Sequence, residues 1–495
     1  MRKWWPLVAV CTGAFMLLVD VTIVMVALPD IAGDLGTSFS ALQWVMDVYA
    51  LVLAALLLGA GSLADLTGRR RIYVAGLALF ALASLACGLA PNIGTLIAAR
   101  GLQGLGAAAM FATTMALLNT TYQGRDRGVA FGVWGAVNGA AAAAGPIAGG
   151  LLTQNFGWRS IFLVNLPISL VAIVLTLRVF RESRNPRARG LDVPGMLTFT
   201  AATAAIVYAL IRATEDGWGS GAVLGLLAAG LAALALFVAV ELRSDDPMLD
   251  LSLFRGGVFT GIMIGAALLT AAAFAYLAYV SLWLQTVLEL NAIQAGLVML
   301  PMSVTAFVVA AAAGRLLHDA PPGRVVGVGL LIIGAGAFAQ AVLTAGSGWA
   351  ALLPGLAIVG LGVGVASPSL SAAAMAAVPQ ERGGMAAGAV NTFRQLGFAF
   401  GVAILGGVFH SGVADGLDGG TPGAGAAAGA LISGRAHAPV GQGHGQVVRE
   451  AFAHGLNVTL LAAGVLGVVA GLIVLALVRT AVRAPAEPEG VGASR

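Results

Sequence analysis

Long apolar runs separated by short polar stretches make up the pattern of this chain. Each run is long enough to cross a membrane, because about 20 apolar residues in a helix span the hydrocarbon core. The runs begin near Pro6, Gln43, Ile72, Gly94, Gly128, Ser160, Val193, Gly221, Val258, Asn291, Arg324, Trp349, Met385 and Phe452. The pattern therefore predicts an all-α integral membrane protein with fourteen transmembrane helices.

One short polar stretch, from Gly61 to Arg71, sets the direction in which these helices run. It places Asp65 and three consecutive arginines between two apolar runs, with Gly68 in a tight turn. Charges at this density cannot lie in hydrocarbon, and short arginine-rich loops lie on the cytoplasmic side. Most of the other arginines fall in loops on the same side, so both termini are predicted to be cytoplasmic.

A faint internal repeat divides the chain. The stretch Gly314–Asp319 follows the tenth span and resembles the turn between the second and third spans. We expect a six-helix bundle at residues 1–180, a linker with two inserted helices at 181–257, and a second six-helix bundle at 258–480. Residues 411–450 are rich in Gly and Ala without periodicity and predict an external mobile loop, and residues 481–495 a cytoplasmic tail.

The composition agrees with a membrane protein and argues against other classes. Of 495 residues, 59% are hydrophobic and 10% charged, too few polar groups to cover a soluble globule of this size. The 26 Lys and Arg against 22 Asp and Glu reflect cytoplasmic loops and not a nucleic-acid surface. The histidines lack metal-binding spacing, both cysteines lie in apolar runs, and a single lysine, Lys3, leaves no phosphate-binding loop.

Two charged residues lie deep in the predicted membrane. At 1.5 Å per residue, Asp20 is about 14 Å inside the outer end of the first span, and Arg100, which precedes Gln103, is about 9 Å deep in the fourth. A charge at such depth is costly unless it is paired, so both are candidate functional groups at comparable levels. Alternatively, Asp20 is a polar residue that only packs helices together. For Arg100, the alternative is a side chain whose charged group extends to the outer headgroups.

A third charged residue, Asp47, lies about one turn below the outer surface in the second span. We interpret its neighbours Trp44 and Tyr49 as aromatic anchors at the membrane interface. Asp47 is either a second protonatable group near an outer gate or a solvated residue at the rim. Its depth decides between the two, since the cost of a charge rises with depth in the membrane.

Polar residues on the thirteenth span predict part of a substrate cavity. Arg394 lies about 14 Å from the inner end of this helix, and Asn391 and Gln395 flank it. We expect Arg394 to face the central cavity or a cluster of carbonyl groups, with Gln103 and Asn138 as cavity candidates from the first half. No Asp or Glu lies deep in spans nine to fourteen, which leaves the partner of Arg394 open and puts a strictly cationic substrate in doubt.

Several motifs resemble those of the major facilitator superfamily, and in particular its fourteen-helix drug:proton antiporters. The stretch Asp20–Pro29 is similar to the first-helix motif of those antiporters. The polar turn carries, in the order of the superfamily's loop motif, Gly61, Asp65, Gly68, Arg69 and Arg70. The fifth span resembles the element typical of antiporters through Gly139, Gly145, Pro146, Gly149 and Gly150.

This resemblance implies a proton-coupled transporter that exports hydrophobic small molecules, such as drugs, antibiotics or dyes, by alternating access. It implies that Asp20, whose proton affinity Arg100 tunes, exchanges a proton for substrate, with Asp47 as a further coupling candidate. It also implies that Asp65 bonds to a helix of the second half near Gly383 and locks the outward-facing state.

The same resemblance implies a monomer in the lipid bilayer of the cell membrane, with protons and a small hydrophobic substrate as partners. No cofactor and no nucleic acid are expected, because the proton-motive force supplies the energy. The alternatives are a dedicated exporter of an endogenous metabolite and a proton symporter. A polytopic membrane enzyme fits less well, since the deep polar residues are isolated on several helices.

Overall fold

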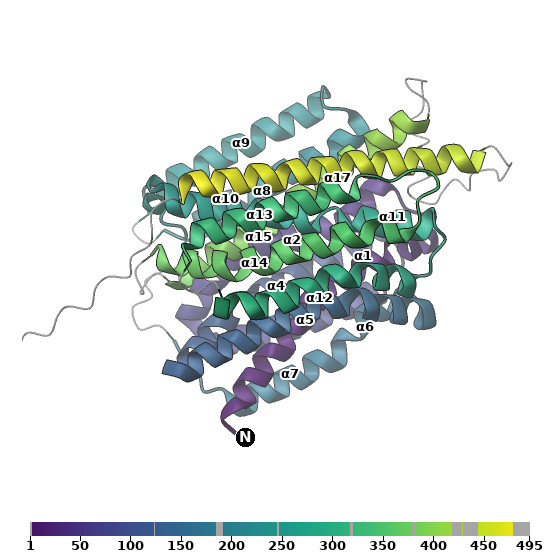
Figure 1. The fold of residues 1–495 in the computed structure, drawn as a ribbon. Helices are drawn as coiled ribbons and strands as arrows, with labels where there is room; N and C mark the ends of the chain where they lie inside the picture. Colours follow the sequence, from purple (N-terminus) through teal and green to yellow (C-terminus); the bar gives the residue numbers. More distant parts are fainter. Residues whose placement is uncertain are drawn as a thin grey trace, which may run out of the picture.

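The computed structural model describes residues 2–122, 124–184, 192–244, 247–316, 320–378, 383–417, 428 and 444–478. Every regular element within these residues is a helix. Figure 1 shows the long helices aligned along one common direction, as expected where backbone polar groups must be satisfied inside each helix. The predicted all-α membrane fold is confirmed, and the predicted tail at 481–495 lies outside the described residues.

The first half of the chain begins with a short 3-10 turn, η1 (Arg2–Trp4), and continues in α-helices. These are α1 (Trp5–Leu35), α2 (Phe39–Thr67), α3 (Arg69–Gly88), α4 (Ile93–Thr121), α5 (Gly124–Phe156), α6 (Ser160–Leu163) and α7 (Asn165–Val179). The inserted helices are α8 (Val193–Asp216) and α9 (Gly221–Glu241), and η2 (Leu251–Arg255) leads to the second half.

The regular elements in the described residues of the second half are likewise helices. These are α10 (Gly257–Phe274), α11 (Leu277–Thr286), α12 (Ala292–Leu316), α13 (Pro322–Gln340), η3 (Trp349–Leu352), α14 (Leu353–Ala376), α15 (Gly383–Leu417) and α17 (His444–Leu477). Pro301 and Pro368 lie inside α12 and α14, where each removes one backbone donor.

The helices account for all fourteen predicted spans. Thirteen stretches of the described residues are long and apolar enough to cross a membrane, with α10 and α11 together forming one of them and α6 and α7 another. The remaining predicted span corresponds to α5, whose 33 residues give a length of about 50 Å.

Glycine allows close contact between helices in the first half. A Cβ atom at Gly106 of α4 would lie 2.7 Å from the backbone nitrogen of Phe80 on α3. A Cβ atom at Gly104 would lie 2.7 Å from the carbonyl oxygen of Tyr49 on α2. Larger residues would separate these helices, so the two glycines bring the polar residues of α4 against α2 and α3.

The two halves meet where α2 packs on α15 and where α5 packs on α12. The inserted helix α8 packs against both α2 and α15, and α9 packs against α8. Figure 1 shows α9 at one edge of the molecule, and its largely unburied apolar surface suits contact with lipid. Helices α8 and α9, the predicted inserted pair, therefore lie beside the place where α2 packs on α15.

The prediction of an unstructured loop over residues 411–450 is wrong at both ends. Helix α15 continues to Leu417 and α17 begins at His444, and most of the residues between them lie outside the described ones. A Cβ atom at Gly416 would lie 2.6 Å from the Cα atom of Ala451. The Gly and Ala residues that hide helical periodicity in the sequence allow α15 and α17 to pack closely.

Candidate functional site

A buried polar cluster surrounds Asp20 in the middle of α1. Its side chain is 0% exposed and accepts hydrogen bonds from three side chains on two other helices. Arg100 Nη1 of α4 donates to Oδ2 at 2.6 Å, and Gln103 Nε2 donates to Oδ1 at 2.9 Å. Asn165 Nδ2 at the start of α7 also donates to Oδ1 at 2.9 Å. The cluster therefore gives the Asp20 carboxyl one guanidinium and two amide groups as partners.

Ser84 of α3 bonds to both amide side chains of this cluster. Its Oγ accepts hydrogen bonds from Gln103 Nε2 at 2.8 Å and from Asn165 Nδ2 at 3.3 Å. Gln103 Oε1 in turn accepts from Arg100 Nη1 at 2.7 Å. Four helices thus share one hydrogen-bond network, and each deletion within it would leave a buried polar atom unpaired.

Arg100 is held inside the protein and is 2% exposed, so it does not extend to the headgroups. Its Nε donates to the carbonyl oxygen of Val45 on α2 at 3.0 Å. The guanidinium carbon lies 4.3 Å from the ring centre of Tyr49 and 5.9 Å from that of Phe162. Tyr49 is 2% exposed, so the interpretation of Tyr49 as an interfacial anchor is wrong: it supports Arg100 by a cation–π contact.

The antiporter-like element on α5 lies against the helix that carries Asp20. A Cβ atom at Gly149 would lie 3.0 Å from both the carbonyl oxygen and Cγ1 of Ile23, and one at Gly145 would collide with Thr22. Gly150 is buried as well. The side-chain surroundings of Gly139 and Pro146, and of the cavity candidate Asn138, lie outside what the structure describes.

Asp47 is 0% exposed, which rules out a solvated position at the rim in this conformation. Neither carboxyl oxygen has a hydrogen-bond partner in the structure. A buried carboxylate without partners carries a large desolvation cost. Asp47 therefore differs from Asp20, whose charge is balanced, although both lie in the first half of the chain.

One turn before Asp47, Gln43 takes part in a contact between the two halves. Tyr279 of α11 donates its hydroxyl to the carbonyl oxygen of Val402 on α15 at 2.7 Å. Gln43 Nε2 of α2 donates to the same carbonyl and to the Tyr279 hydroxyl, each at 3.4 Å. These bonds close the end of the protein at which α2 begins, the end predicted to face outward.

Further contacts at this end join α1 to α11 and α2 to α15. Gln285 Nε2 of α11 donates to the carbonyl oxygen of Val26 on α1 at 2.9 Å. The ring of Phe39 stacks on His410 with centres 6.1 Å apart. The halves are thus tied together by both polar and aromatic groups at the predicted outer end.

At the opposite end, the predicted polar turn is built around Gly68. Its φ of 128° is a conformation that only glycine adopts easily, and it separates α2 from α3. Asp65 pairs with Arg69, with Oδ1 2.9 Å from Nε and 2.8 Å from Nη2. Gly61 has room, since a Cβ atom there would have only the Ala112 methyl nearby, at 3.9 Å.

The predicted bond between Asp65 and the second half is absent from the described part of this conformation. Asp65 uses Arg69, four residues away on the next helix, as its partner, and residues 379–382 before α15 are not described. Arg70 Nη1 instead donates to the carbonyl oxygen of Phe180, after α7, at 2.9 Å. The contact of Asp65 near Gly383 stays a prediction for another state of the protein.

The predicted cavity residues of the thirteenth span lie on α15. Arg394 Nη2 donates to the carbonyl oxygen of Ser367 on α14 at 3.1 Å, to the Ser367 hydroxyl at 2.9 Å, and to the Ser371 hydroxyl at 3.5 Å. Asn391 and Gln395, three residues before and one after it, are partly exposed. The structure does not bring these residues into the Asp20 cluster, so the predicted site residues fall into separate groups.

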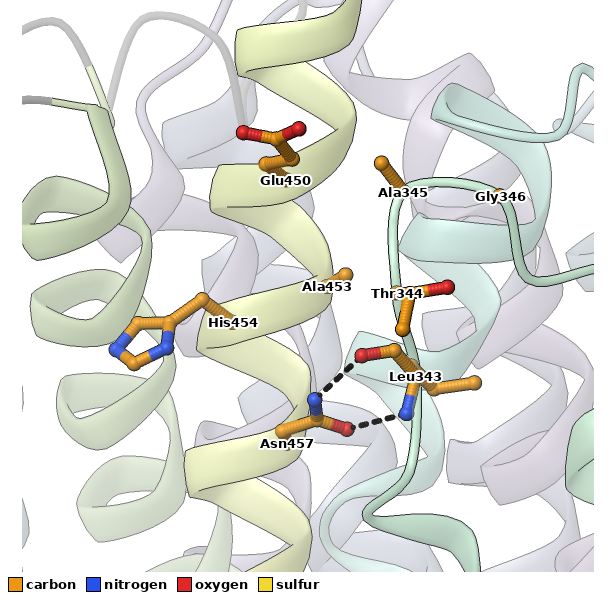
Figure 2. A pocket seen from close by; sticks show the side chains of 8 residues that line it. All are labelled: Leu343, Thr344, Ala345, Gly346, Glu450, Ala453, His454 and Asn457. Carbon is orange, nitrogen blue, oxygen red and sulfur yellow. Dashed lines mark hydrogen bonds between the residues drawn. The ribbon is translucent and has the colours of Figure 1, made fainter.

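A cavity of about 340 Å³ lies between α17 and residues 343–346, away from all of these groups. Figure 2 shows Asn457 joined to Leu343 by two hydrogen bonds of 2.7 and 2.9 Å, with His454 pointing to the other side of α17. No three His, Cys, Asp or Glu residues are grouped as a metal site in the part of the chain that the structure describes.

Sequence reasoning did not assign a role to Ser84, Glu182 or Tyr279. Ser84 lies in an apolar run and looks like an ordinary packing residue, and Tyr279 looks like an ordinary aromatic residue of a span. Glu182 carried a signal, because it is an acid between two arginines just after the sixth span. Only the folded chain shows which partners these residues meet.

A buried network around an ionisable residue, inside a bundle of long apolar helices, is typical of membrane transporters. The sequence profile of the Major Facilitator Superfamily matches residues 10–402, most of the chain. The chain therefore belongs to the Major Facilitator Superfamily, a family of membrane transporters.

Relatives with assigned roles agree with the motifs. The multidrug resistance protein Stp of Mycobacterium tuberculosis is 38% identical over 405 residues, which cover 81% of this chain and 75% of Stp. The puromycin resistance protein pur8 of Streptomyces alboniger is 38% identical over 417 residues, which cover 82% of this chain and 81% of pur8. The predicted resemblance to drug-efflux members of this superfamily is confirmed.

Among solved structures, the human organic anion transporter MFSD10 (TETRAN) superposes with a TM-score of 0.62. The match covers 95% of this chain and 99% of that chain at 13% sequence identity. At this identity the likeness shows the fold alone, and it confirms the major facilitator arrangement of the helices.

Proposed function

We propose that the protein exports small hydrophobic molecules, including antibiotics, in exchange for protons by alternating access. The observation that carries this proposal is Asp20, a carboxyl buried at the centre of a network from four helices. Ionisable groups are costly inside the membrane, and they are typical of proton and ion pathways. The names of Stp and pur8 support drugs as the substrates.

The geometry provides a way to couple protonation to helix movement. With Asp20 ionised, Arg100 balances its charge and joins α1 to α4. With Asp20 protonated, Arg100 keeps its bonds to Val45 and Gln103 and its contact with Tyr49, but the ion pair with α1 is lost. Proton binding therefore weakens one contact between helices, and a substrate can favour one of the two states.

Asp47 is proposed as a second proton site that responds to the gate. In the closed state it is buried without a hydrogen-bond partner, one helical turn from Gln43. Opening the contact of Gln43 with Tyr279 and Val402 would admit water to this end. Ionised Asp47 is stabilised only when water reaches it, so its deprotonation favours the open state.

The remaining parts of the proposal follow from the helix pattern. The protein acts as a monomer in the cell membrane, both termini face the cytoplasm, and the proton-motive force replaces a cofactor. The arginine-rich turn at Gly68 supports this orientation, because arginine concentrates in short cytoplasmic loops.

The test uses purified protein in proteoliposomes with an imposed pH gradient and labelled puromycin as the probe. We expect the wild type to accumulate puromycin against its gradient and to release protons when puromycin is added. Asp20→Asn keeps the shape of the side chain but removes its titration, so both signals should disappear. Asp415→Asn, at an exposed position near the end of α15, is the matched control and should keep both.

Undiminished puromycin accumulation by Asp20→Asn would contradict the role of Asp20. The direction of puromycin movement relative to the proton gradient distinguishes proton antiport from proton symport. Accumulation that runs in the same direction as the protons would identify a symporter and refute the antiport proposal.

A further inference from the structure

Arg394 has no counter-charge among the described residues. The three acceptors of its guanidinium are a carbonyl oxygen and two hydroxyl oxygens on α14, all of them uncharged, and all are reached by Nη2. Arg100, in contrast, has the carboxylate of Asp20 at 2.6 Å. An arginine stays charged in any environment in a protein, so the charge of Arg394 is solvated by dipoles alone.

Within the part of the second half that the structure describes, the membrane-spanning helices supply no acid that could reach Arg394. The acids in its described membrane-spanning helices are Asp415 and Glu450, both at the predicted outer ends. Asp415 lies 21 residues further along the same helix, about 31 Å away at 1.5 Å per residue. The Asp20 carboxyl group already accepts hydrogen bonds from Arg100, Gln103 and Asn165. An uncompensated charge in a membrane helix is costly and indicates a partner that comes from outside the protein.

The surroundings of Arg394 offer further unused hydrogen-bonding groups. Its Nε is buried without an acceptor, and no acceptor of the described chain is bonded to Nη1. Asn391, three residues before Arg394, lies on the same face of α15, and Gln395 directly follows Arg394; both are partly exposed, and neither has a hydrogen bond among the described residues. Ser371 is also partly exposed. Arg394 therefore has donors without a partner, with polar side chains beside it.

We propose that Arg394, with Ser371 and Gln395 beside it, binds the acidic group of a transported substrate, a carboxylate or a similar planar anion. This inference rests on the proposed export function and adds one class of substrate to it: amphipathic organic acids with a hydrophobic body. The guanidinium suits this role because its planar donors match the oxygen atoms of a carboxylate. Ser367 holds Nη2 and so positions the group, while the remaining donors face a ligand.

The competing explanation is structural. Arg394 bonds to the carbonyl oxygen of Ser367, directly before Pro368, and could serve only to brace α14 where proline interrupts its hydrogen bonds. Under that explanation, changes at Arg394 would alter stability and the binding of every substrate equally. Under the proposal, they would alter the binding of acids and leave that of neutral analogues in place.

The test measures binding to the purified full-length protein in lipid nanodiscs without a gradient. The probes are 1-pyrenebutyric acid and 1-pyrenebutyramide, which share one hydrophobic body and differ in charge at neutral pH. Energy transfer from protein tryptophans to pyrene reports binding, with empty nanodiscs as the blank. We expect the wild type to bind the acid about tenfold more tightly than the amide, the gain of one charge-assisted contact.

Arg394→Gln should bind the acid about tenfold more weakly and the amide as before. Arg394→Lys should keep part of the preference for the acid, since the charge remains without the planar fork. Arg255→Gln removes the same charge at an exposed position before α10 and should keep the full preference. Should Arg394→Gln fail to fold, Arg394→Lys and Ser371→Ala provide the comparison, each with a reduced preference.

Equal affinity of the wild type for acid and amide would overturn the proposal. A preference for the acid that persists in Arg394→Gln would also overturn it. So would an equal loss of affinity for the acid and the amide in all variants of this site. Binding is measured without transport, so the two proposals fail separately. Puromycin accumulation without a preference for the acid would refute only this one, and an Arg394-dependent preference without coupled transport would refute only the proposed function.

Discussion

Glu182 accepts a hydrogen bond of 3.0 Å from the backbone N–H of Arg70 in the first turn of α3. Its other oxygen accepts from the backbone N–H of Arg71 at 3.2 Å. The first N–H groups of a helix have no partner within it, and a carboxylate there also interacts favourably with the helix dipole. The segment after α7 is thereby fastened to the turn that carries Asp65.

We predict that Glu182→Ala lowers the stability of the first half by about 1 kcal/mol, the usual contribution of a capping side chain. The two backbone donors at Arg70 and Arg71 lose their acceptor, and the midpoint of thermal unfolding of the purified protein should fall. Glu182→Gln keeps one acceptor oxygen, so its midpoint of thermal unfolding should fall less. An unchanged midpoint in Glu182→Ala would show that water replaces the carboxylate without cost.

Asp65→Asn should leave stability nearly unchanged but lower transport. The pair of Asp65 and Arg69 is partly exposed, and such pairs contribute less than about 1 kcal/mol. The contact near Gly383 is predicted for another state of the protein, so Asp65→Asn should affect the transport cycle and not the stability of this state. Puromycin transport at matched protein levels is the measurement, and a wild-type rate would remove Asp65 from the mechanism.

Gly149→Val should prevent α5 from packing against α1. A Cβ atom there meets the carbonyl oxygen of Ile23 at 3.0 Å, and the branched side chain adds two more carbon atoms. We expect a clear loss of folded protein in size-exclusion chromatography, because overpacking of this kind costs about 1–3 kcal/mol. Gly225→Val on α9, where nothing lies within 4 Å, is the matched control. Equal yields of the two variants would refute the importance of this contact.

Tyr279→Phe should weaken the closed state at the predicted outer end. It removes the donor to Val402 and an acceptor of Gln43, so the closed state loses about 1 kcal/mol relative to the open one. A cysteine at the buried position Phe39 should then react faster with a membrane-impermeant maleimide, by a factor of about five.

The control for this gate experiment is Tyr276→Phe. Tyr276 accepts a hydrogen bond from Gln340 at 3.1 Å within the second half, so it does not join the two halves. Labelling at position 39 should stay at the rate of the unsubstituted protein. Equal acceleration in both variants would indicate general loosening and would contradict a specific role of Tyr279.

The class of protein and the order of its helices follow from the sequence alone. Apolar runs of sufficient length have one stable arrangement in lipid, because each backbone polar group must be satisfied within its own helix. The same reasoning places Asp20 and Arg100 at comparable depths, since depth along a helix is a matter of counting residues. Because an unpaired charge inside the membrane is costly, we expect both residues to have partners.

Which helices face one another was decided only by the tertiary structure. Ser84 and Asn165 meet at Asp20 from α3 and α7, although 81 residues separate them in sequence. Tyr49 turns inward to Arg100, because the rotation of α2 about its own axis is set by its packing on α4 and not by its aromatic residues. Counting along a sequence gives the height of a side chain, but its direction depends on how neighbouring helices pack.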